Sequence, residues 1–173
     1  MLSAIGEDPV ENIENLPPSG NMALSVLRST SRDFQEEGHW FNAEDDYPLS
    51  PNDDGEIVIP DSIISLTSPD MNVVERRPRL YNLGSKSFHF DAPLSCSVIL
   101  HLEWGELPSV ARRYITALAI ERFVDGIPGV EAVSQARARN LLRAKAAFDK
   151  AAIRNGGLNL LNNTTIQNLI RRN

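Results

Sequence analysis

Cysteine is nearly absent from this 173-residue chain, because Cys96 is the only one. An intrachain disulfide is therefore impossible, and a reducing cytoplasm is the simplest compartment to expect. No obvious histidine partner lies near Cys96 in the sequence. We therefore interpret this residue as a small core residue rather than as a nucleophile.

Long hydrophobic runs are also lacking. The longest apolar stretches are far shorter than the roughly 18 residues that a membrane span needs, so no membrane contact is expected. The N-terminus, MLSAIGEDPV, has no basic segment followed by an apolar one and does not resemble a signal peptide. The composition, 42% hydrophobic and 23% charged, is ordinary for one globular domain or for a domain with a sizeable insertion.

The motifs of the common enzyme classes are missing as well. The chain contains no glycine-rich phosphate loop, no HExxH, no GxSxG and no CxxC. A metal site built from His39, His89 and His101 would need further ligands, so His89 and His101 are interpreted as structural residues of strands. We predict no catalytic, cofactor-binding or metal-binding residues, and no cofactor.

Acidic residues are present in short runs, at Glu44–Asp46 and at Asp53–Asp54. Such runs could supply the carboxylate pair of a glycoside hydrolase, although a solvated loop is the simpler interpretation. The stretch LSPNDDGEIVIPD also resembles a calcium loop with Gly55 at its sixth position. Ser50 and Asp61 match poorly at the first and twelfth positions, so we prefer a β-hairpin with an Asp-Gly turn.

Charge is unevenly divided along the chain. Residues 1–70 contain 15 Asp/Glu and 2 Arg, whereas residues 71–173 contain 8 Asp/Glu and 15 Lys/Arg. This division fits two solvated faces that simply differ. It also fits complementary faces that contact neighbouring copies or a polyanion.

Helical periodicity occupies both ends of the chain. Residues 1–5 are interpreted as the end of a helix that starts upstream and is capped by Gly6. Further helices are predicted over 22–37, 106–125 and 129–152, the first of them capped by Ser19 or Asn21. The predicted core stripe of the second of these consists of Val110, Tyr114, Ala117, Leu118 and Phe123 or Val124.

Between these helices the apolar period changes to two, which predicts strands. The strongest covers 95–103 and places Cys96, Val98, Leu100 and Leu102 on one face. The other predicted strands cover 40–42, 56–60 and 62–67, together with a hairpin that pairs 79–83 with 86–90. The fold class is therefore α+β. We expect a helix-bundle domain (1–38 with 105–155) with an inserted, mainly antiparallel β domain (39–104).

The C-terminal residues 156–173 are predicted to form a separate tail, because Asn155-Gly156-Gly157 should end the preceding helix. This tail is too apolar for a solvated disordered end. Thr164 or Thr165 could cap a short helix, which would be marginal alone. The tail therefore packs on its own domain or, as we favour, on a partner.

Four segments in this order resemble the tail tubular protein A family of short-tailed (T7-like) bacteriophages, whose members are also called tail adaptors or gatekeepers. The segments span roughly residues 1–150 and read MLSAIGEDPV, EGHWFNAEDDYPLSPNDDGEIVIPDSI, RPRLYNLGSKSFHF and ELPSVARRYITALAIERF. The resemblance implies a helix bundle that carries an inserted β domain, in agreement with the change of period.

The resemblance also implies a structural virion protein rather than an enzyme. Such a protein forms a twelve-membered ring between the phage portal and a tail nozzle of the tail tubular protein B type. The ring forms part of the DNA ejection channel, and a tail fibre attaches nearby. Double-stranded DNA passes through without specific binding. The protein would be made in the host bacterial cytoplasm and reside in the virion tail.

On this interpretation, charged residues form contacts between subunits and the tail docks on the portal. Two alternatives remain open, a carbohydrate-degrading hydrolase that uses Asp53 and Asp54 and a DNA-binding module built on the basic helix 130–152. The expected inter-subunit residues are Arg137, Arg139, Arg143, Asp45, Asp46, Asp53 and Asp54, and the expected portal-docking residues are Leu158, Leu160, Leu161, Ile166, Leu169, Ile170, Arg171 and Arg172.

Overall fold

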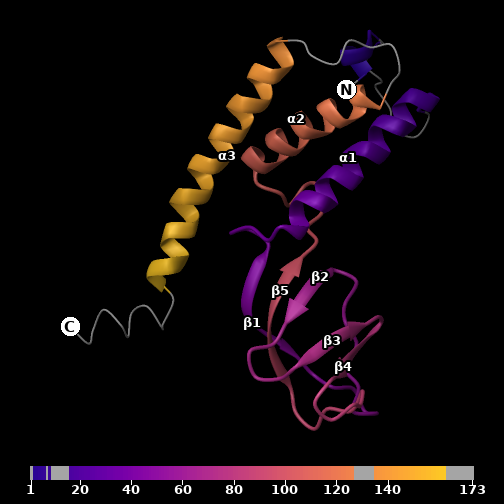
Figure 1. Cartoon of the computed structure of the whole chain (residues 1–173), viewed down its shortest axis with the longest axis vertical. Helices are drawn as coiled ribbons and strands as arrows, with labels where there is room; N and C mark the ends of the chain where they lie inside the picture. The colour runs from indigo at the N-terminus through magenta and orange to yellow at the C-terminus, as the bar shows by residue number, and fades with distance from the viewer. Residues whose placement is uncertain (1, 7, 9–15, 127–134, 163–173) are drawn as a thin grey trace. The chain divides into compact units, whose positions relative to one another are not determined.

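A computed structural model describes residues 2–6, 8, 16–126 and 135–162 (Figure 1). The chain divides into two compact units, one formed by residues 1–34 with 106–173 and the other by residues 35–105. Helices dominate the first unit and antiparallel strands the second, which confirms the predicted α+β class.

Three long helices make up most of the helical unit: α1 (Pro18–Glu36), α2 (Ser109–Asp125) and α3 (Gln135–Asn162). A short 3-10 helix, η1 (Leu2–Ile5), precedes them and ends at Gly6, whose φ of 82° is the left-handed conformation expected of a helix-ending glycine. The predicted capping of α1 by Ser19 or Asn21 is wrong, because the helix already begins at Pro18. Proline is tolerated there, because N–H groups in the first helical turn have no acceptor within the helix and the missing N–H of proline costs no hydrogen bond.

An aromatic cluster joins the three helices, with one ring from each. Phe34 of α1 lies edge-on to Tyr114 of α2 and to Phe148 of α3, with ring centroids 5.6 and 5.0 Å apart. Tyr114 and Phe148 are 5.5 Å apart. Edge-to-face aromatic pairs contribute about 0.5–1.5 kcal/mol beyond the area they bury, so this cluster fixes how the helices meet.

The core stripe of α2 differs from the predicted one by a rotation of one residue. Four of the five buried residues follow a four-residue spacing, Ala111, Ile115, Ala119 and Phe123, whereas Val110, Tyr114 and Leu118 are only half-buried. Val124 is buried as well, so the predicted end of the stripe at Phe123 or Val124 is confirmed. Alanine at every second position lets a neighbouring helix approach closely. The sequence pattern missed this stripe because apolar residues lie on most sides of the helix, so periodicity alone does not select the buried side.

α3 continues through Asn155-Gly156-Gly157, where we predicted its end, so that prediction is wrong. Glycine inside a helix costs about 1 kcal/mol relative to alanine and does not by itself stop the helix. The Asn155 amide Nδ2 donates a hydrogen bond to the carbonyl of Ala151, 2.9 Å away, which keeps this asparagine inside the helix.

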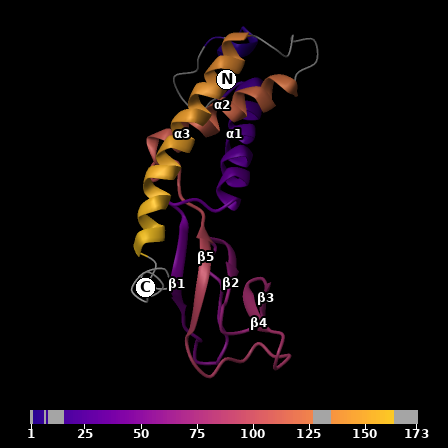
Figure 2. The same ribbon diagram turned by 60° about the vertical axis from the view of Figure 1, so that its left-hand side comes forward.

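The β unit contains two small antiparallel sheets (Figure 2). The first has the strand order β1 (Ala43–Leu49), β5 (Leu94–Leu100), β2 (Ile63–Thr67), and the second pairs β3 (Val73–Arg76) with β4 (Arg79–Asn82). As predicted, Cys96 and Val98 share the buried face of the central strand β5. Its other face carries Ser95 and Ser97.

Several predicted strand pairings are wrong. The turn at Gly55 exists, but it does not join a hairpin, because β1 pairs with β5 and the segment after the turn forms single bridges to Arg79 and His89. Likewise β4 pairs along its length with β3, and of the predicted hairpin with residues 86–90 only a single bridge between Asn82 and Ser87 forms. Leu80 of β4 is fully buried in the core, and this burial decides which partner the strand takes.

The expected strand 40–42 is also wrong, since these residues form a turn held by a buried amide. Asn42 donates hydrogen bonds of 2.9 Å to the carbonyls of Gln35 and Leu100 and accepts one of 2.8 Å from the His39 N–H. The Gln35 side chain in turn pairs with both the N–H and the carbonyl of Leu102. This network fastens the two chain ends of the β unit to each other.

Candidate interaction surfaces

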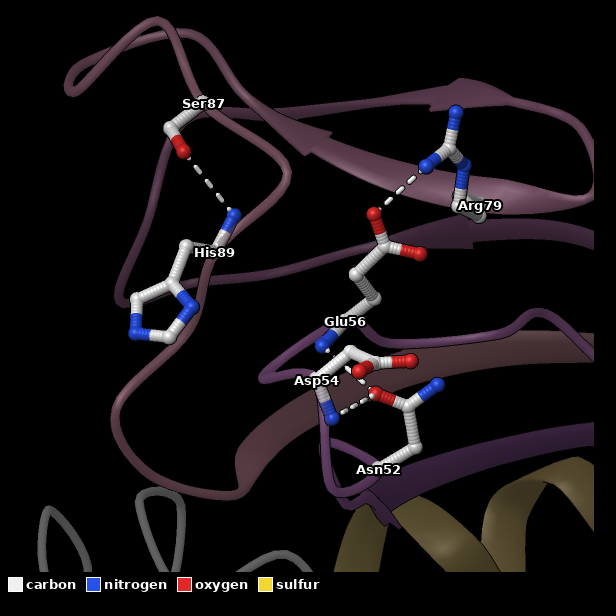
Figure 3. Close-up of polar contacts among 6 residues, drawn as sticks. All are labelled: Asn52, Asp54, Glu56, Arg79, Ser87 and His89. Carbon is white, nitrogen blue, oxygen red and sulfur yellow. Dashed lines mark hydrogen bonds and ion pairs between the residues drawn. The ribbon is translucent and has the colours of Figure 1, made fainter.

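The acidic turn at residues 52–56 is organised by the side chain of Asn52 (Figure 3). Its oxygen Oδ1 accepts hydrogen bonds from the N–H groups of Asp54 and Glu56, at 3.1 and 2.9 Å. The Gly55 N–H donates to the Asn52 carbonyl at 2.9 Å, and Gly55 has a φ of 76°. The prediction of a tight Asp-Gly turn is therefore confirmed, and the Asn52 side chain, which would stand at the third position of a calcium loop, serves the turn instead.

Asp53 and Asp54 are exposed at the tip of this turn. A glycoside hydrolase needs two carboxylates that flank the scissile bond from opposite sides. Neighbouring side chains on an exposed tip do not enclose a bond in this way, so the geometry gives the hydrolase no support. The remaining acidic residue of the turn, Glu56, forms an ion pair with Arg79, the first residue of β4.

The acidic run on β1 lies along one edge of the three-stranded sheet. Glu44, Asp45 and Asp46 are all exposed. A bulge between Glu44 and Tyr47 interrupts the pairing with β5, and Asp46 has a φ of 58° within it. Ser97 Oγ donates to Asp45 Oδ1 at 2.7 Å, and Ser95 Oγ lies 3.4 Å from Asp46 Oδ1. The serine hydroxyls therefore fix two carboxylates beside the face of the sheet that is turned away from the core.

The three arginines predicted to contact a neighbouring subunit do not share one environment. Arg137 lies on the inner side of α3, only 15% exposed, with its Nε 3.8 Å from Glu121 Oε1 of α2. Arg139 is exposed and its Nη2 lies 3.3 Å from Gln135 Oε1. Arg143 is exposed. Arg137 therefore helps to join two helices of its own chain, which the sequence could not reveal without the rotation of α3.

Two exposed apolar side chains on α3 were missed by the sequence analysis. Leu142 is 66% exposed and Ile153 is 77% exposed. They are separated by 11 residues, which is close to three helical turns, so they lie on the same side of the helix. Their spacing was readable in the sequence, but the choice of a core face for α3 requires its buried residues, Phe148 and Ala151.

The three histidines have separate neighbours. The His39 ring stacks on Phe41 with 5.3 Å between ring centroids, and the His89 ring lies 3.3 Å from the Asp91 carboxylate. The backbone N–H of His101 donates to the Ser62 carbonyl. Within the described ranges, no group of three or more His, Cys, Asp or Glu side chains is arranged to hold a metal ion.

Cys96 is a core residue, as predicted. It is fully buried within the apolar cluster of the β unit, among residues such as Leu94 and Val98. This burial raises the pKa of the Cys96 thiol above its ordinary value, because the charged thiolate is disfavoured away from water.

The side chains of the expected portal-docking residues lie outside what the structure describes. Residues 163–173 are not described, which includes Ile166, Leu169, Ile170, Arg171 and Arg172. Leu158, Leu160 and Leu161 belong to the last turns of α3, and only their backbone is described.

Comparison with known proteins identifies the chain. A family described as "Tail tubular protein" matches residues 1–158. The chain belongs to the tail tubular protein family. It is a structural protein of a bacteriophage tail. A relative named "Tail tubular protein A", from Klebsiella phage KP34, is 29% identical over 116 residues, which covers 66% of this chain and 62% of the relative.

Across residues 2–6, 8, 16–126 and 135–162, no helix of this tail protein combines the length and the apolar character required to cross a bilayer.

Proposed function

We propose that this tail tubular protein is the adaptor that joins the phage portal to the tail nozzle. The observation that carries the proposal is the family match over residues 1–158, which includes both units. The name of the Klebsiella phage relative agrees with it. In this role the protein is made in the host cytoplasm, assembles into a ring of twelve copies and remains in the virion tail, near the attachment site of a tail fibre.

The proposed activity is assembly and not catalysis. A closed ring requires heterologous contacts, in which each copy presents two different surfaces to its two neighbours. A chain with separate acidic and basic regions suits such contacts, because opposite charges on the two surfaces favour one orientation of the neighbours.

The ring would enclose part of the DNA ejection channel. DNA should pass without tight contacts to its phosphates, so the lumen should be lined by neutral or acidic residues. The β unit, with 13 Asp/Glu and four Lys/Arg, offers such a surface. A structure of the assembled ring tests this directly, and a lumen lined by Arg139 and Arg143 would contradict it.

The portal is proposed to bind the C-terminal segment, from Leu158 to Arg172. This segment contains six Leu or Ile residues and ends in two arginines. The apolar side chains would supply buried contact area. The arginines would supply charge-assisted hydrogen bonds to carboxylates of the portal.

Two deletions test this docking. The first removes residues 163–173 and leaves all of α3 in place, and the second removes residues 157–173. Portal binding should be lost in the longer deletion and strongly weakened in the shorter one, while circular dichroism shows that both chains remain folded. Undiminished portal binding by both deleted chains would refute the proposed docking segment.

A further inference from the structure

α3 presents an outer face that is both apolar and basic. Leu142, Ala146 and Ile153 are exposed along one side of the helix, opposite the buried Phe148. At 100° per residue, Arg139, Arg143 and Lys150 follow one edge of this apolar row, and all three are exposed. We call these six residues the α3 outer stripe. Exposed leucine and isoleucine in a row, with cations beside them, are typical of a surface that a partner covers.

A second α3 is a poor partner for this stripe. The helix carries six Lys/Arg and a single Asp, Asp149, which is already held by Lys145 at 2.7 Å. That hydrogen bond raises the pKa of Lys145, so this cation stays charged. Two such helices side by side would place like charges together, which is strongly unfavourable across an interface. The partner of the stripe must therefore be acidic.

The outer face of the sheet β1-β5-β2 has the complementary properties. Its centre is flat, because Ser65, Ser95 and Ser97 contribute small side chains, and Ile99 adds an apolar contact. At the β1 edge, Asp45 and Asp46 are oriented by the serine hydroxyls. Fixed carboxylates lose little side-chain entropy when they bind a guanidinium, and the pairing can be bidentate.

The cations of the β unit do not neutralise this face. Three of its four Lys/Arg are engaged near the β3–β4 hairpin: Arg77 pairs with Glu75 at 2.8 Å, Arg79 pairs with Glu56, and Arg76 lies over the ring of Tyr81. The contacts of these three cations therefore give the acidic edge of β1 no countercharge, and its exposed carboxylates are open to a cationic partner.

We propose that the α3 outer stripe of one copy docks on the outer face of the sheet β1-β5-β2 of the next copy. Arg139 and Arg143 pair with the carboxylates at the β1 edge, and Leu142 and Ile153 cover the flat serine face beside Ile99. The two surfaces belong to different units of the chain, so the contact is heterologous and can propagate around a ring. This inference rests on the proposed adaptor function and names the contact that the ring would use.

Charge reversal tests the contact. One variant combines Arg139→Glu with Arg143→Glu. A second combines Asp45→Lys with Asp46→Asn, because asparagine tolerates the positive φ of Asp46 and removes its charge. A control combines Arg28→Glu with Arg113→Glu, which applies the same charge change to exposed residues of α1 and α2. Self-association is measured by sedimentation at low salt up to millimolar chain concentration, because salt screens exposed charges.

Each reversal alone should raise the Kd of self-association by about tenfold or more, since close interfacial charge pairs couple strongly. The control should leave the Kd near that of the unmodified chain. An equimolar mixture of the two reversed variants should regain association, because the acidic α3 of one now meets the basic β1 of the other.

Several outcomes would overturn the inference. They are an unmodified chain that stays monomeric at millimolar concentration, reversals that act no differently from the control, and a mixture that does not recover. Recovery only when all four changes are in one chain would indicate a contact within the chain instead. If the variant with Arg139→Glu and Arg143→Glu lost duplex DNA binding but kept unchanged self-association, the α3 outer stripe would be a DNA-binding surface instead.

A parallel assay separates this inference from the adaptor function. If the unmodified chain binds its portal but the mixture fails to recover, only the proposed contact is wrong. If the unmodified chain does not bind its portal, the adaptor function itself fails.

Discussion

Asn42 shows how much a single buried amide contributes to the β unit. Its side chain is 1% exposed and makes three hydrogen bonds to the backbone, at both chain ends of the unit. Buried backbone groups need partners, and here a side chain supplies them where no strand continues. The sequence alone did not single out Asn42, because an asparagine after Trp40-Phe41 is also consistent with an exposed strand end.

Replacement of Asn42 by alanine should lower the free energy of unfolding by about 3 kcal/mol, because it leaves buried donors and acceptors without partners. Urea unfolding followed by circular dichroism measures the change. Asn52→Ala is the matched control, since the Asn52 side chain also hydrogen-bonds the backbone, at the N–H groups of Asp54 and Glu56, but is exposed. Equal losses in the two variants would show that burial of the Asn42 network is unimportant.

Gly55 is a residue whose role the sequence did predict. Its positive φ costs a residue with a Cβ about 1–2 kcal/mol, and an added Cβ would meet the ring of His89. Gly55→Ala should therefore destabilise the protein by at least the backbone cost, with a steric part no larger than the cost of turning the exposed His89 ring aside.

The steric part of the Gly55→Ala effect can be separated from the backbone part by adding His89→Ala. We expect the double variant to recover the steric part and to retain a loss of about 1–2 kcal/mol. Gly105→Ala, where an added Cβ meets nothing within 4 Å, serves as the control. A Gly55→Ala variant as stable as the Gly105→Ala variant would be inconsistent with the turn described here.

At the scale of elements, α2 was placed correctly but rotated incorrectly. The helix ends before Gly126, as the sequence predicts, and starts at Ser109, three residues after the predicted start at residue 106. Which side of it faces the core depends on neighbours that are distant in sequence, namely α1 and α3. When a helix is apolar on most sides, its sequence does not indicate which side is buried.

A pair of alanine substitutions on α2 tests the observed face. Ile115→Ala should cost about 3 kcal/mol of unfolding free energy, because Ile115 is fully buried and its loss leaves a cavity. Leu118→Ala should cost about 1 kcal/mol, because Leu118 is only half-buried. Thermal unfolding of both variants gives the comparison. A larger loss for Leu118→Ala would favour the stripe predicted from the sequence.

Strand pairing was the least predictable part of the fold. β5 could be recognised by its alternation of buried and polar residues, and it became the central strand. The partners of the shorter strands could not, because four-residue strands such as β3 and β4 carry too little pattern to specify a register. Their pairing follows from the burial of Leu80 and from the turn at Arg77–Pro78.

The candidate surfaces were only partly predictable for the same reason. The division of charge along the chain indicated that acidic and basic regions exist, and the acidic β1 edge is one of them. The sequence could not show that Arg137 turns inward toward Glu121, while Leu142 and Ile153 stay exposed. These facts depend on the rotation of α3 about its axis, which the aromatic cluster with Phe34 and Tyr114 fixes.

For the whole molecule, family membership and physical reasoning agree on an assembly protein. The family match covers both units, and the chain presents an acidic sheet on one and a basic helix on the other. The residue patterns in the sequence predicted no catalytic site. The surfaces that remain to be explained are those suited to contacts with other protein chains.

If this chain is, as we propose, an adaptor that assembles on the phage portal, the portal should gain mass when the chain is added. Mass photometry of the portal, alone and mixed with increasing amounts of this chain, measures the gain. We expect one heavier species, in which the added mass saturates at a fixed number of chains per portal ring. A portal whose mass is unchanged at every ratio, with the chain remaining separate, would contradict the proposal.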